Sequence, residues 1–355
     1  MIRLEADDNL RARIKVIGVG GGGCNAINRM INSNIKGVEF IAANTDALAL
    51  KQSLASYRIQ LGEDSTKGLG AGGNPEIGRT AAEESRDVIR KALDGADMVF
   101  VTAGMGGGTG TGASPVFSAM SKEMGILTVA IATKPFSFEG AVRMKQAEAG
   151  FKNLEGTADT ILIIPNQKLF TLINKDTLIE EAFNTVDDVL RQGVQAITDI
   201  ITSQSIIQVD FADVKAIMKD AGKALMGIGE GEGEKRTIDA ISRAMDSPLL
   251  ENISIAGARG ILVNITGNPK NLTMFEVSDA MDLVKKEISK DCHVYFGQTY
   301  DSSLDKKVKV TVVATNFEEK SEHGETKPDY FDSQLTTSAE PDAVDVPPAM
   351  RKKTF

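Results

Sequence analysis

A run of seven residues, Gly106-Gly107-Gly108-Thr109-Gly110-Thr111-Gly112, decides the fold class of this chain. It follows an apolar segment over 97–103 that is typical of a buried strand, and it opens a helical pattern over 110–124. Glycine lets a backbone approach phosphate oxygens because it has no Cβ, and the amino end of a helix attracts negative charge. The two threonines add hydroxyl donors. The run therefore predicts a phosphate-binding turn between a strand and a helix.

A second glycine-rich turn, Gly18-Val19-Gly20-Gly21-Gly22-Gly23, lies between an expected strand at 13–19 and a helix at 25–31. Its spacing satisfies G-x-G-x-x-G, and Asp46 is a loose candidate for a ribose ligand, so an NAD(P) oxidoreductase is one alternative. That class needs only one such turn, and the chain has no convincingly placed proton donor. A Walker A loop is disfavoured because neither glycine run carries its lysine. A glycine turn without a ligand also stays open.

Strand and helix patterns alternate through the first half of the chain, which predicts a parallel sheet covered on both faces. A helix over about 177–202 has apolar residues around much of its surface, so we expect it to be buried between two domains. After Gly222 the pattern predicts a smaller domain with a mixed sheet. The other expected strands are 38–43, 126–133, 160–164, 224–228, 260–266, 293–297 and 307–314, and the other expected helices are 46–52, 75–93, 139–154, 235–245 and 274–289.

Composition excludes several classes. The 355 residues are 42% hydrophobic and 25% charged, as in ordinary globular proteins, and the net charge of −9 disfavours binding to nucleic acid or anionic lipid. The isolated Cys24 and Cys292 give no disulfide framework or zinc site, and His293 and His323 have no ligand cluster around them. We expect no signal peptide and no membrane span.

The end of the chain differs from the rest. Between Phe317 and Asp345 there are nine acidic residues and two lysines, which predicts a flexible acidic tether over 316–344. A basic peptide over 345–355 follows it, with two prolines.

Four further motifs accompany the glycine-threonine run. They are Asn44-Thr45-Asp46, the segment 73–79 (GNPEIGR), the segment 134–140 (KPFSFEG) and Val209-Asp210-Phe211-Ala212-Asp213. In this order, the five motifs resemble the FtsZ family, the bacterial tubulin-like cell-division GTPases. The resemblance covers about residues 13–315 and resumes in the last dozen residues. It implies a tubulin-like α/β fold, in which a Rossmann-type parallel-sheet GTPase domain is joined by a long central helix to a smaller α+β domain. The implied divisions are a flexible segment 1–12, a GTP-binding domain 13–176, the central helix 177–203, a catalytic loop and following helix 204–221, an activation domain 222–315, the linker 316–344 and a partner-binding peptide 345–355.

The resemblance also implies a GTP site. Its expected residues are Gly21, Gly22, Gly23, Cys24, Asn25, Asn44, Gly72, Gly73, Asn74, Gly107, Gly108, Thr109, Gly110, Glu139, Arg143, Asn166, Phe183 and Asp187. Glu139 and Arg143 would contact the ribose, while Asn166, Phe183 and Asp187 would select guanine. A carboxylate can accept hydrogen bonds from guanine N1 and N2, which adenine cannot offer. On the sequence alone, Phe183 as a core residue and Asp187 as a solvated residue remain alternatives.

In the family, the loop around Asp210 and Asp213 reaches the nucleotide of the neighbouring subunit, so these two aspartates are the expected catalytic residues. On the sequence alone, Asp210 is as well explained as a helix N-cap and Asp213 as a surface charge. The resemblance implies GTP hydrolysis with Mg²⁺ held mainly by the phosphates, with K⁺ as a candidate monovalent ion. It further implies a head-to-tail homopolymer in a cytoplasmic mid-cell ring beneath the inner membrane. The peptide 345–353 would bind a membrane-anchored actin-like adaptor and other division proteins, without direct membrane insertion.

Some residues depart from the family pattern. Gln208 stands where the family usually has Asn, Leu48 replaces a usual Gln, and Ala349 and Met350 replace larger hydrophobic residues. Gln208 keeps open a second alternative, a tubulin-like scaffold that binds nucleotide without hydrolysing it. For Cys24 we expect a small packing residue with no redox role, although a helix N-terminus beside phosphates can lower a thiol pKa.

Overall fold

The computed structural model describes residues 12–171, 176–202, 209–247 and 255–317. The N-terminal segment up to Arg11, Gln208, the acidic linker beyond Phe317 and the C-terminal peptide lie outside these residues.

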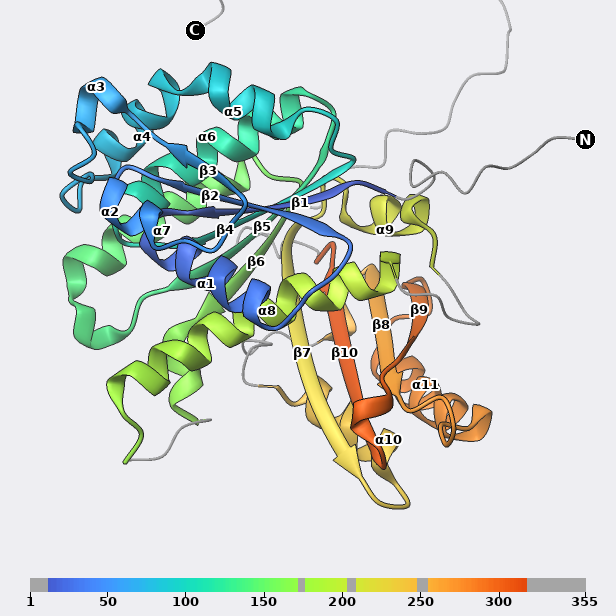
Figure 1. The fold of residues 1–355 in the computed structure, drawn as a ribbon. Coiled ribbons are helices and arrows are strands. Elements are labelled where there is room, and N and C mark those ends of the chain that lie inside the picture. Colours follow the sequence, from blue (N-terminus) through green and yellow to red (C-terminus); the bar gives the residue numbers. More distant parts are fainter. Residues whose placement is uncertain (1–11, 172–175, 203–208, 248–254, 318–355) are drawn as a thin grey trace, which may run out of the picture. The chain divides into compact units, whose positions relative to one another are not determined.

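Within the described ranges, ten strands form one sheet, in the order β3-β2-β1-β4-β5-β6-β7-β10-β8-β9 (Figure 1). Neighbouring strands are parallel except where β10 pairs with β7 and β8. The strands are β1 (Ile14–Val19), β2 (Val38–Asn44), β3 (Tyr57–Gln60), β4 (Met98–Gly104), β5 (Leu127–Lys134), β6 (Thr160–Pro165), β7 (Gly222–Glu232), β8 (Gly260–Gly267), β9 (His293–Tyr300) and β10 (Lys307–Thr315).

Eleven α-helices lie in the described part of the chain. They are α1 (Gly20–Asn32), α2 (Ala47–Lys51), α3 (Glu63–Thr66), α4 (Pro75–Glu84), α5 (Arg86–Leu93), α6 (Thr109–Glu123), α7 (Ala141–Glu155), α8 (Ile179–Thr202), α9 (Phe211–Met218), α10 (Arg236–Met245) and α11 (Met274–Glu287). None of the described helices is long and apolar enough to cross a membrane.

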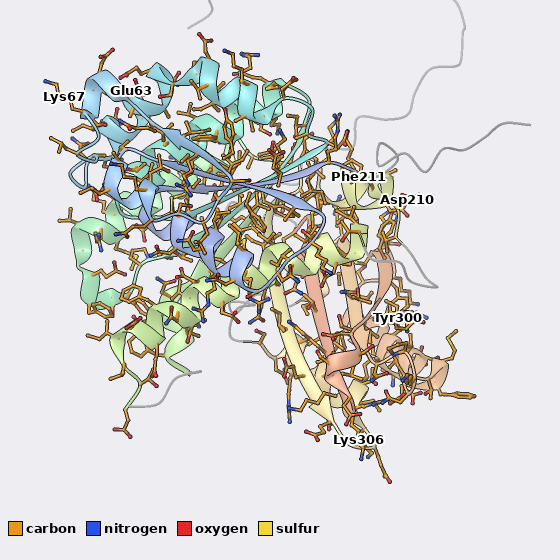
Figure 2. The ribbon with its side chains drawn as sticks, viewed as in Figure 1. Glu63, Lys67, Asp210, Phe211, Tyr300 and Lys306 are labelled. Carbon is orange, nitrogen blue, oxygen red and sulfur yellow. The ribbon has the colours of Figure 1, made fainter. Side chains whose placement is uncertain are left out.

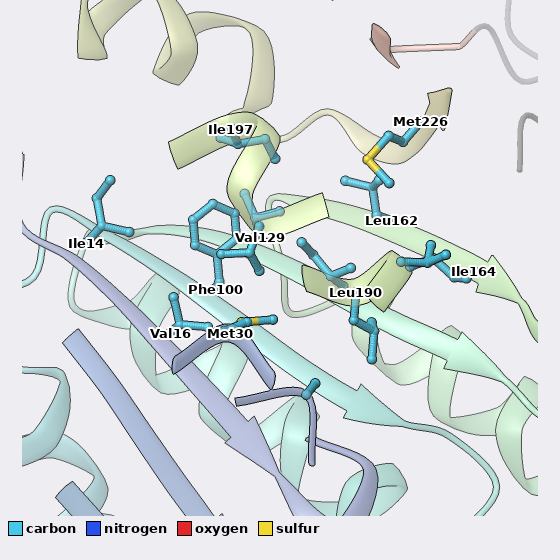
Figure 3. Close-up of a cluster of buried hydrophobic side chains, with 14 of the residues drawn as sticks. Ile14, Val16, Met30, Phe100, Val129, Leu162, Ile164, Leu190, Ile197 and Met226 are labelled. Atoms are coloured by element: carbon cyan, nitrogen blue, oxygen red, sulfur yellow. The ribbon is translucent and has the colours of Figure 1, made fainter. Parts of the chain in front are cut away.

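The first strands are buried on both faces, as the apolar runs predicted. In β1, Val16 belongs to one hydrophobic core and the next residue, Ile17, belongs to another, because successive side chains of a strand point to opposite faces. The first core includes residues of α1 and α8, such as Met30 and Leu190 (Figure 3). The second includes residues of α4, α5 and α6, such as Phe117. The predicted parallel sheet with helices on both faces is therefore present.

The long helix α8 runs over 24 residues, or about 36 Å. It confirms the helix expected over 177–202, although its first residues differ from the expectation. Ile179 and Phe183 are exposed, Phe183 to 41%, whereas the residues from Val186 to Ile200 provide the buried face. The apolar residues of α8 therefore fall into two groups, those that face the core and those that are exposed in its first turns.

The second half of the sheet carries its own core, in which α10 and α11 cover β7, β8 and β10. It is a mixed sheet, as expected, but it is continuous with the first half because β7 pairs in parallel with β6 over residues 160–162 and 222–224. Arg236, which is buried, makes a bidentate ion pair with Glu276 and donates to the carbonyl oxygens of Asn271 and Lys306. These bonds tie α10 to the amino end of α11.

One predicted helix is divided. The pattern predicted a single helix over 75–93, but it breaks at Ser85 into α4 and α5. The Ser85 hydroxyl donates to the Ala81 carbonyl and accepts from the Gly62 amide, so it replaces helical bonding with a contact to another segment. The prediction of one continuous helix was wrong for this reason.

Two short elements were missed, and one helix starts earlier than predicted. The missed elements are β3, which adds an edge strand beside β2, and the single turn α3. Helix α1 starts at Gly20 rather than at Asn25, because packing overrides the poor helix propensity of glycine. A Cβ on Gly23 would lie 2.5 Å from the Thr102 carbonyl oxygen, so only glycine permits this approach of α1 to β4.

The contact between α4 and α6 predicts a large effect of one methyl group. A Cβ at Gly112 would lie 1.9 Å from the Pro75 carbonyl oxygen and 2.6 Å from the Arg79 nitrogen. We expect Gly112→Ala to lower the free energy of unfolding by about 2 kcal/mol or more, because backbone atoms must separate. Gly156→Ala is the control, since its Cβ would meet nothing closer than 3.8 Å. Equal urea midpoints for the two variants would contradict this account of the helix contact.

Candidate functional site

A cavity of about 440 Å³ lies at the carboxyl ends of β4, β5 and β6. Its wall comes from the turn after β1, the glycine run after β4, the segment after β5, Asn166 after β6 and one face of α8. In open α/β sheets, ligands bind at the carboxyl ends of the strands. Both glycine-rich turns predicted from the sequence therefore border one cavity.

The two turns offer backbone to this cavity. At Gly21 and Gly107, nothing lies within 4 Å of the position that a Cβ would occupy, and both residues line the cavity. On the other sides the turns are packed tightly, since a Cβ on Gly20 would lie 2.8 Å from the Gly110 nitrogen. The space over the two turns is thus a cradle bounded by main chain, which suits a phosphate chain.

The threonine hydroxyls are already engaged within the protein. Thr109 shares a hydrogen bond of 2.6 Å with Thr45, and the Thr111 hydroxyl accepts from the Gly106 amide at 2.8 Å. Thr109 still lines the cavity, whereas Thr111 lies beyond its lining. Thr111 therefore braces the turn, which differs from the expected role as a phosphate donor.

Two polar side chains of the cavity wall, Asn166 and Asp187, are in unfavourable surroundings. The Asn166 side chain is buried, and its Oδ1 has no hydrogen-bond partner within the described part of the chain. Burial raises the pKa of Asp187 to about 6, and the Arg29 guanidinium opposes this shift. A planar base with N–H donors would satisfy both groups, since an unpaired buried acceptor is costly.

Aromatic rings and an ion pair complete the wall. The Phe183 ring packs edge-on against Phe136 at 5.6 Å, and both belong to a cluster with Phe138 and Phe170. Glu139 pairs with Arg143 at 2.5 Å and accepts from the Phe136 amide. Glu139 and Arg143 therefore lie together on the cavity wall, which suits polar contacts to a sugar.

Twelve of the eighteen residues expected for the nucleotide line this cavity, and six do not. The twelve are Gly21, Gly22, Asn25, Gly107, Gly108, Thr109, Gly110, Glu139, Arg143, Asn166, Phe183 and Asp187. The six outside its lining are Gly23, Cys24, Asn44, Gly72, Gly73 and Asn74. Their individual roles toward a nucleotide stay predictions.

The six have visible places in the fold. Gly23 packs on β4, and the Asn44 side chain accepts from the Asp46 amide. Asn74 caps α4 by accepting from the Glu76 amide, and a Cβ on Gly108 would lie 3.0 Å from the Asn74 nitrogen. The loop that contains Gly72 and Gly73 therefore adjoins the glycine run without lining the cavity.

Cys24 faces the core. Its side chain is 3% exposed, and its Sγ lies 3.8 Å from the Gly18 carbonyl oxygen. Burial raises the pKa of this thiol to about 11. This burial agrees with the expected packing role. Because the side chain faces the core, only the backbone of Cys24 could contact a nucleotide.

Sequence reasoning missed six lining residues, which are Gly104, Met105, Thr133, Pro135, Val186 and Leu190. Two signals in the sequence could have found most of them. Gly104 and Thr133 lie at the carboxyl ends of predicted strands. Val186 and Leu190 are three residues beyond Phe183 and Asp187, so they share their helix face.

A larger cavity of about 650 Å³ lies beside α8, where it is bordered by residues of β8, β9 and β10. Its wall carries both signs of charge, including Arg191, Asp199 and Lys309. Burial raises the pKa of Asp199 to about 6 and lowers the pKa of Lys309. None of the described residues in its lining is a glycine, so the smaller cavity is the candidate phosphate site.

Asp210 and Asp213 lie at the opposite end of the sheet from the smaller cavity. Asp210, labelled in Figure 2, caps α9. Its side chain accepts from the Asp213 amide at 2.8 Å. At the end of α9, the Met218 carbonyl accepts from the hydroxyl of Thr160, the first residue of β6, whereas Asn166 follows the last residue of β6. Six residues of extended chain separate these ends by about 20 Å. The predicted N-cap is confirmed, and the two aspartates stand far from the cavity of their own chain.

Comparison with known proteins agrees with this arrangement. The family model for the Tubulin/FtsZ GTPase domain matches residues 13–174, and the model for the FtsZ C-terminal domain matches residues 222–318. The chain is 40% identical to FtsZ of M. jannaschii, solved as an empty dimer, with a TM-score of 0.83 over 90% of this chain and 96% of that chain. The chain belongs to the Tubulin/FtsZ family. The resemblance inferred from the five motifs is confirmed, as is the tubulin-like fold.

Further structures of the Tubulin/FtsZ family agree. A tryptophan-to-tyrosine mutant of M. jannaschii FtsZ is 43% identical, with a TM-score of 0.83 over 87% of this chain and 92% of that chain. CetZ2 of Haloferax volcanii, solved as a GTPγS-bound protofilament, is 21% identical with a TM-score of 0.72 over 87% and 94%. At that identity CetZ2 shows the fold alone. The GTPase domain of the Tubulin/FtsZ family implies that this chain binds GTP.

Burial of Cys24 predicts unequal reactivity of the two thiols. Cys292 is partly exposed, although burial also raises its pKa. Because the thiolate is the nucleophile, we expect Cys24 of the folded protein to react with a maleimide at least about tenfold more slowly than Cys292. Mass spectrometry of digested protein would measure both rates, with Cys292→Ser as control. Faster labelling of Cys24 would contradict the buried position.

Proposed function

We propose that this chain binds GTP in the 440 Å³ cavity and hydrolyses it when the α9 of a neighbouring copy completes the site. The observation that carries the proposal is the separation of two half-sites. The glycine cradle lies at the carboxyl ends of the strands, and the paired aspartates open α9, whose carboxyl end is bonded to the amino end of β6. In a head-to-tail arrangement, the aspartates of one copy can approach the glycine cradle of the next copy.

Binding would use the main chain for the phosphates. Residues of the two turns line the cradle, and α1 and α6 begin within these turns, so negative charge is favoured there. The open space over Gly21 and Gly107 leaves room for phosphate oxygens that a side chain would displace.

Guanine selection would come from Asn166, Phe183 and Asp187. The unpaired Oδ1 of Asn166 is an acceptor, and ionised Asp187 can accept from two guanine N–H donors. Adenine would leave the buried carboxylate unpaired, so the site should disfavour it. Phe183 offers a ring face or edge to the base from α8.

Hydrolysis would need little covalent participation by the protein. A water attacks the γ-phosphorus, the bond to the β–γ bridging oxygen breaks, and GDP and inorganic phosphate result. Asp213 and Asp210 of the neighbour would accept hydrogen bonds from that water and so orient it. Mg²⁺, held mainly by the phosphates, would neutralise charge on them, and K⁺ is the candidate monovalent ion. The backbone cradle would hold the leaving diphosphate.

Exposed apolar residues support contact between copies. Beside the cavity, Phe138 is 65% exposed and Val142, Leu178 and Ile179 are also exposed. At the start of α11, Met274 and Phe275 are exposed, Phe275 to 83%. Exposed apolar groups on different parts of a subunit suit a head-to-tail contact, which does not close and therefore yields filaments.

The family is one of cell-division proteins that form homopolymers. We extend the proposal to a division ring beneath the inner membrane, to which the segment 345–353 would bind a membrane-anchored actin-like adaptor and other division proteins. This segment lies outside the described residues.

The proposal predicts a concentration threshold for hydrolysis. Phosphate release from GTP should appear only above a threshold protein concentration, should be much slower from ATP, and should fall about a hundredfold in Asp213→Ala, because positioning of the water is lost. Asp87→Ala is a matched control, since Asp87 also lies in the first turn of a helix and is exposed.

Release strictly proportional to protein concentration would contradict an interface-completed site. Filaments without phosphate release would instead favour the non-hydrolysing scaffold.

The raised pKa of Asp187 predicts a pH dependence of binding. Below pH 6 the carboxyl group of the empty site is protonated and cannot accept both guanine donors. For a group with a pKa of about 6 that ionises on binding, GDP affinity should fall about fourfold between pH 7 and pH 5.5. Asp187→Asn should bind more weakly and show a flat profile over this range. Equal pH profiles of the two proteins, measured by calorimetry, would remove Asp187 from the base site.

A further inference from the structure

The turn that joins α9 to β7 has an unusual backbone. Asp220 has a φ of +51° and Gly222 a φ of +66°. Glycine adopts the left-handed region freely, but for aspartate it is uncommon and is kept only where surrounding contacts enforce it. Helix α9 ends at Met218, two residues before Asp220. Contacts that hold Asp220 in place therefore also fix the position of the carboxyl end of α9.

Two side chains from other elements hold Asp220. Lys122, at the last turn of α6, pairs with the Asp220 carboxylate at 2.6 Å and with Asp159 at 3.3 Å. Asp159 accepts from the Asp220 amide at 3.4 Å through the same oxygen. The hydrogen bond that Lys122 donates to Asp220 is the largest contribution to the raised pKa of Lys122. The same bond is the largest contribution to the lowered pKa of Asp220. The turn is therefore fixed both by its side chain and by its backbone.

Asp159 ties this group to the sheet. Its side chain is 5% exposed, and its other oxygen accepts from the Thr128 amide of β5 at 2.9 Å. Its carbonyl accepts from the Gly222 amide, and the next residue, Thr160, donates to the Met218 carbonyl. The carboxyl end of α9 is thus anchored to the amino ends of β5 and β6.

Lys122 also lies on the helix that forms the glycine cradle. Helix α6 begins at Thr109 in the cavity wall, and 13 residues later it places Lys122 at the opposite end, about 20 Å away. The helix that orients the phosphate turn at one end of the subunit thereby contacts the α9 anchor at the other end.

We propose that Lys122, acting through Asp220, is a positioning residue that sets the orientation in which α9 presents Asp210 and Asp213 to the neighbouring subunit. This inference rests on the proposed function. Lys122 does not line the cavity, so its loss should leave nucleotide binding in the same subunit unchanged. The effect should fall on hydrolysis at the interface to which that subunit contributes α9.

The test compares four variants with the unmodified full chain. Lys122→Met removes the charge while keeping an unbranched side chain, and Lys122→Arg keeps the charge. Asp220→Asn removes the acceptor charge but suits the left-handed backbone, which Asn adopts about as readily as Asp. The fourth is the Lys122→Met/Asp220→Asn double variant. Lys91→Met, at an exposed position near the end of α5, is the matched control.

We expect Lys122→Met to hydrolyse GTP about tenfold more slowly per assembled subunit, because small displacements of a positioned group cost rate. GTP affinity, pelleted polymer and Tm should stay at the level of Lys91→Met. Lys122→Arg should recover most of the rate. In the double variant the two losses should not add, since both substitutions break one contact.

Mixed polymers separate a positioning role from a general defect. If only the subunit that contributes α9 matters, the rate should fall linearly with the fraction of Lys122→Met mixed into unmodified protein. Rates below this straight line would mean that Lys122→Met alters both sides of the interface. That result would overturn the proposed role of Lys122 in positioning α9.

The outcomes also separate this inference from the proposed function. If the unmodified chain lacks a threshold or Asp213→Ala keeps full activity, the proposed function itself fails. If both behave as proposed but Lys122→Met hydrolyses GTP at the unmodified rate, the other α9 anchors suffice, such as the Asn316 side chain, which donates from Nδ2 to the Ile217 carbonyl. Only the role of Lys122 then falls.

Discussion

Close contact between main chains, with no room for a Cβ, is the constraint on which this structure depends. A Cβ on Gly20 would meet the Gly110 backbone, one on Gly78 would lie 2.4 Å from the Gly108 carbonyl oxygen, and one on Gly112 would overlap Pro75. The turn after β1, the turn after β4 and the start of α4 therefore touch through backbone alone. Side chains could not achieve this spacing, because any Cβ would separate the segments and open the cradle between them. The same absence of side chains leaves main chain as the cavity wall at Gly21 and Gly107.

The parallel sheet then determines what one subunit can do alone. All strands around the cavity run the same way, so their carboxyl ends gather at the cradle and their amino ends gather about 20 Å away. Helix α9 is anchored at the amino end of β6, through Thr160 and Asp159. No small movement of α9 brings Asp213 to its own cavity, because β6 and α6 are rigid elements of that length. Under the proposed function, a single subunit would therefore have a binding site without its catalytic aspartates, and a second copy in the same orientation would supply them.

Much of this arrangement was predictable from local sequence. The apolar runs, the two glycine turns and the apolar spacing of α8 predicted the sheet, the phosphate-binding turns and the long helix. The resemblance of five motifs to the FtsZ family supplied the twelve expected site residues that line the cavity. What failed depended on partners distant in sequence. The Ser85 break needs the Gly62 amide, and the edge strand β3 needs β2. The group formed by Lys122, Asp159 and Asp220 was not visible either, because these residues are 37 and 61 positions apart along the chain. They meet only because the carboxyl ends of α6 and α9 and the amino end of β6 lie at the same edge of the sheet.

The base end of the cavity carries a cost that only a matching ligand can offset. Asn166 has a buried oxygen without a partner among the described residues, and Asp187 lies where burial opposes its charge. Each group would be more stable hydrogen-bonded, and a core of apolar residues at these positions would be more favourable for the empty protein. Under the proposed function, these two groups beside Phe183 would select the nucleotide base. A base with suitable N–H donors would form hydrogen bonds with the Asn166 oxygen and the Asp187 carboxylate, which would stabilise the complex. A base without those donors would leave the carboxylate desolvated and unpaired, which would destabilise the complex. Under the proposed function, a phosphate cradle built of main chain would not distinguish one nucleoside from another, so discrimination would have to come from this end of the cavity.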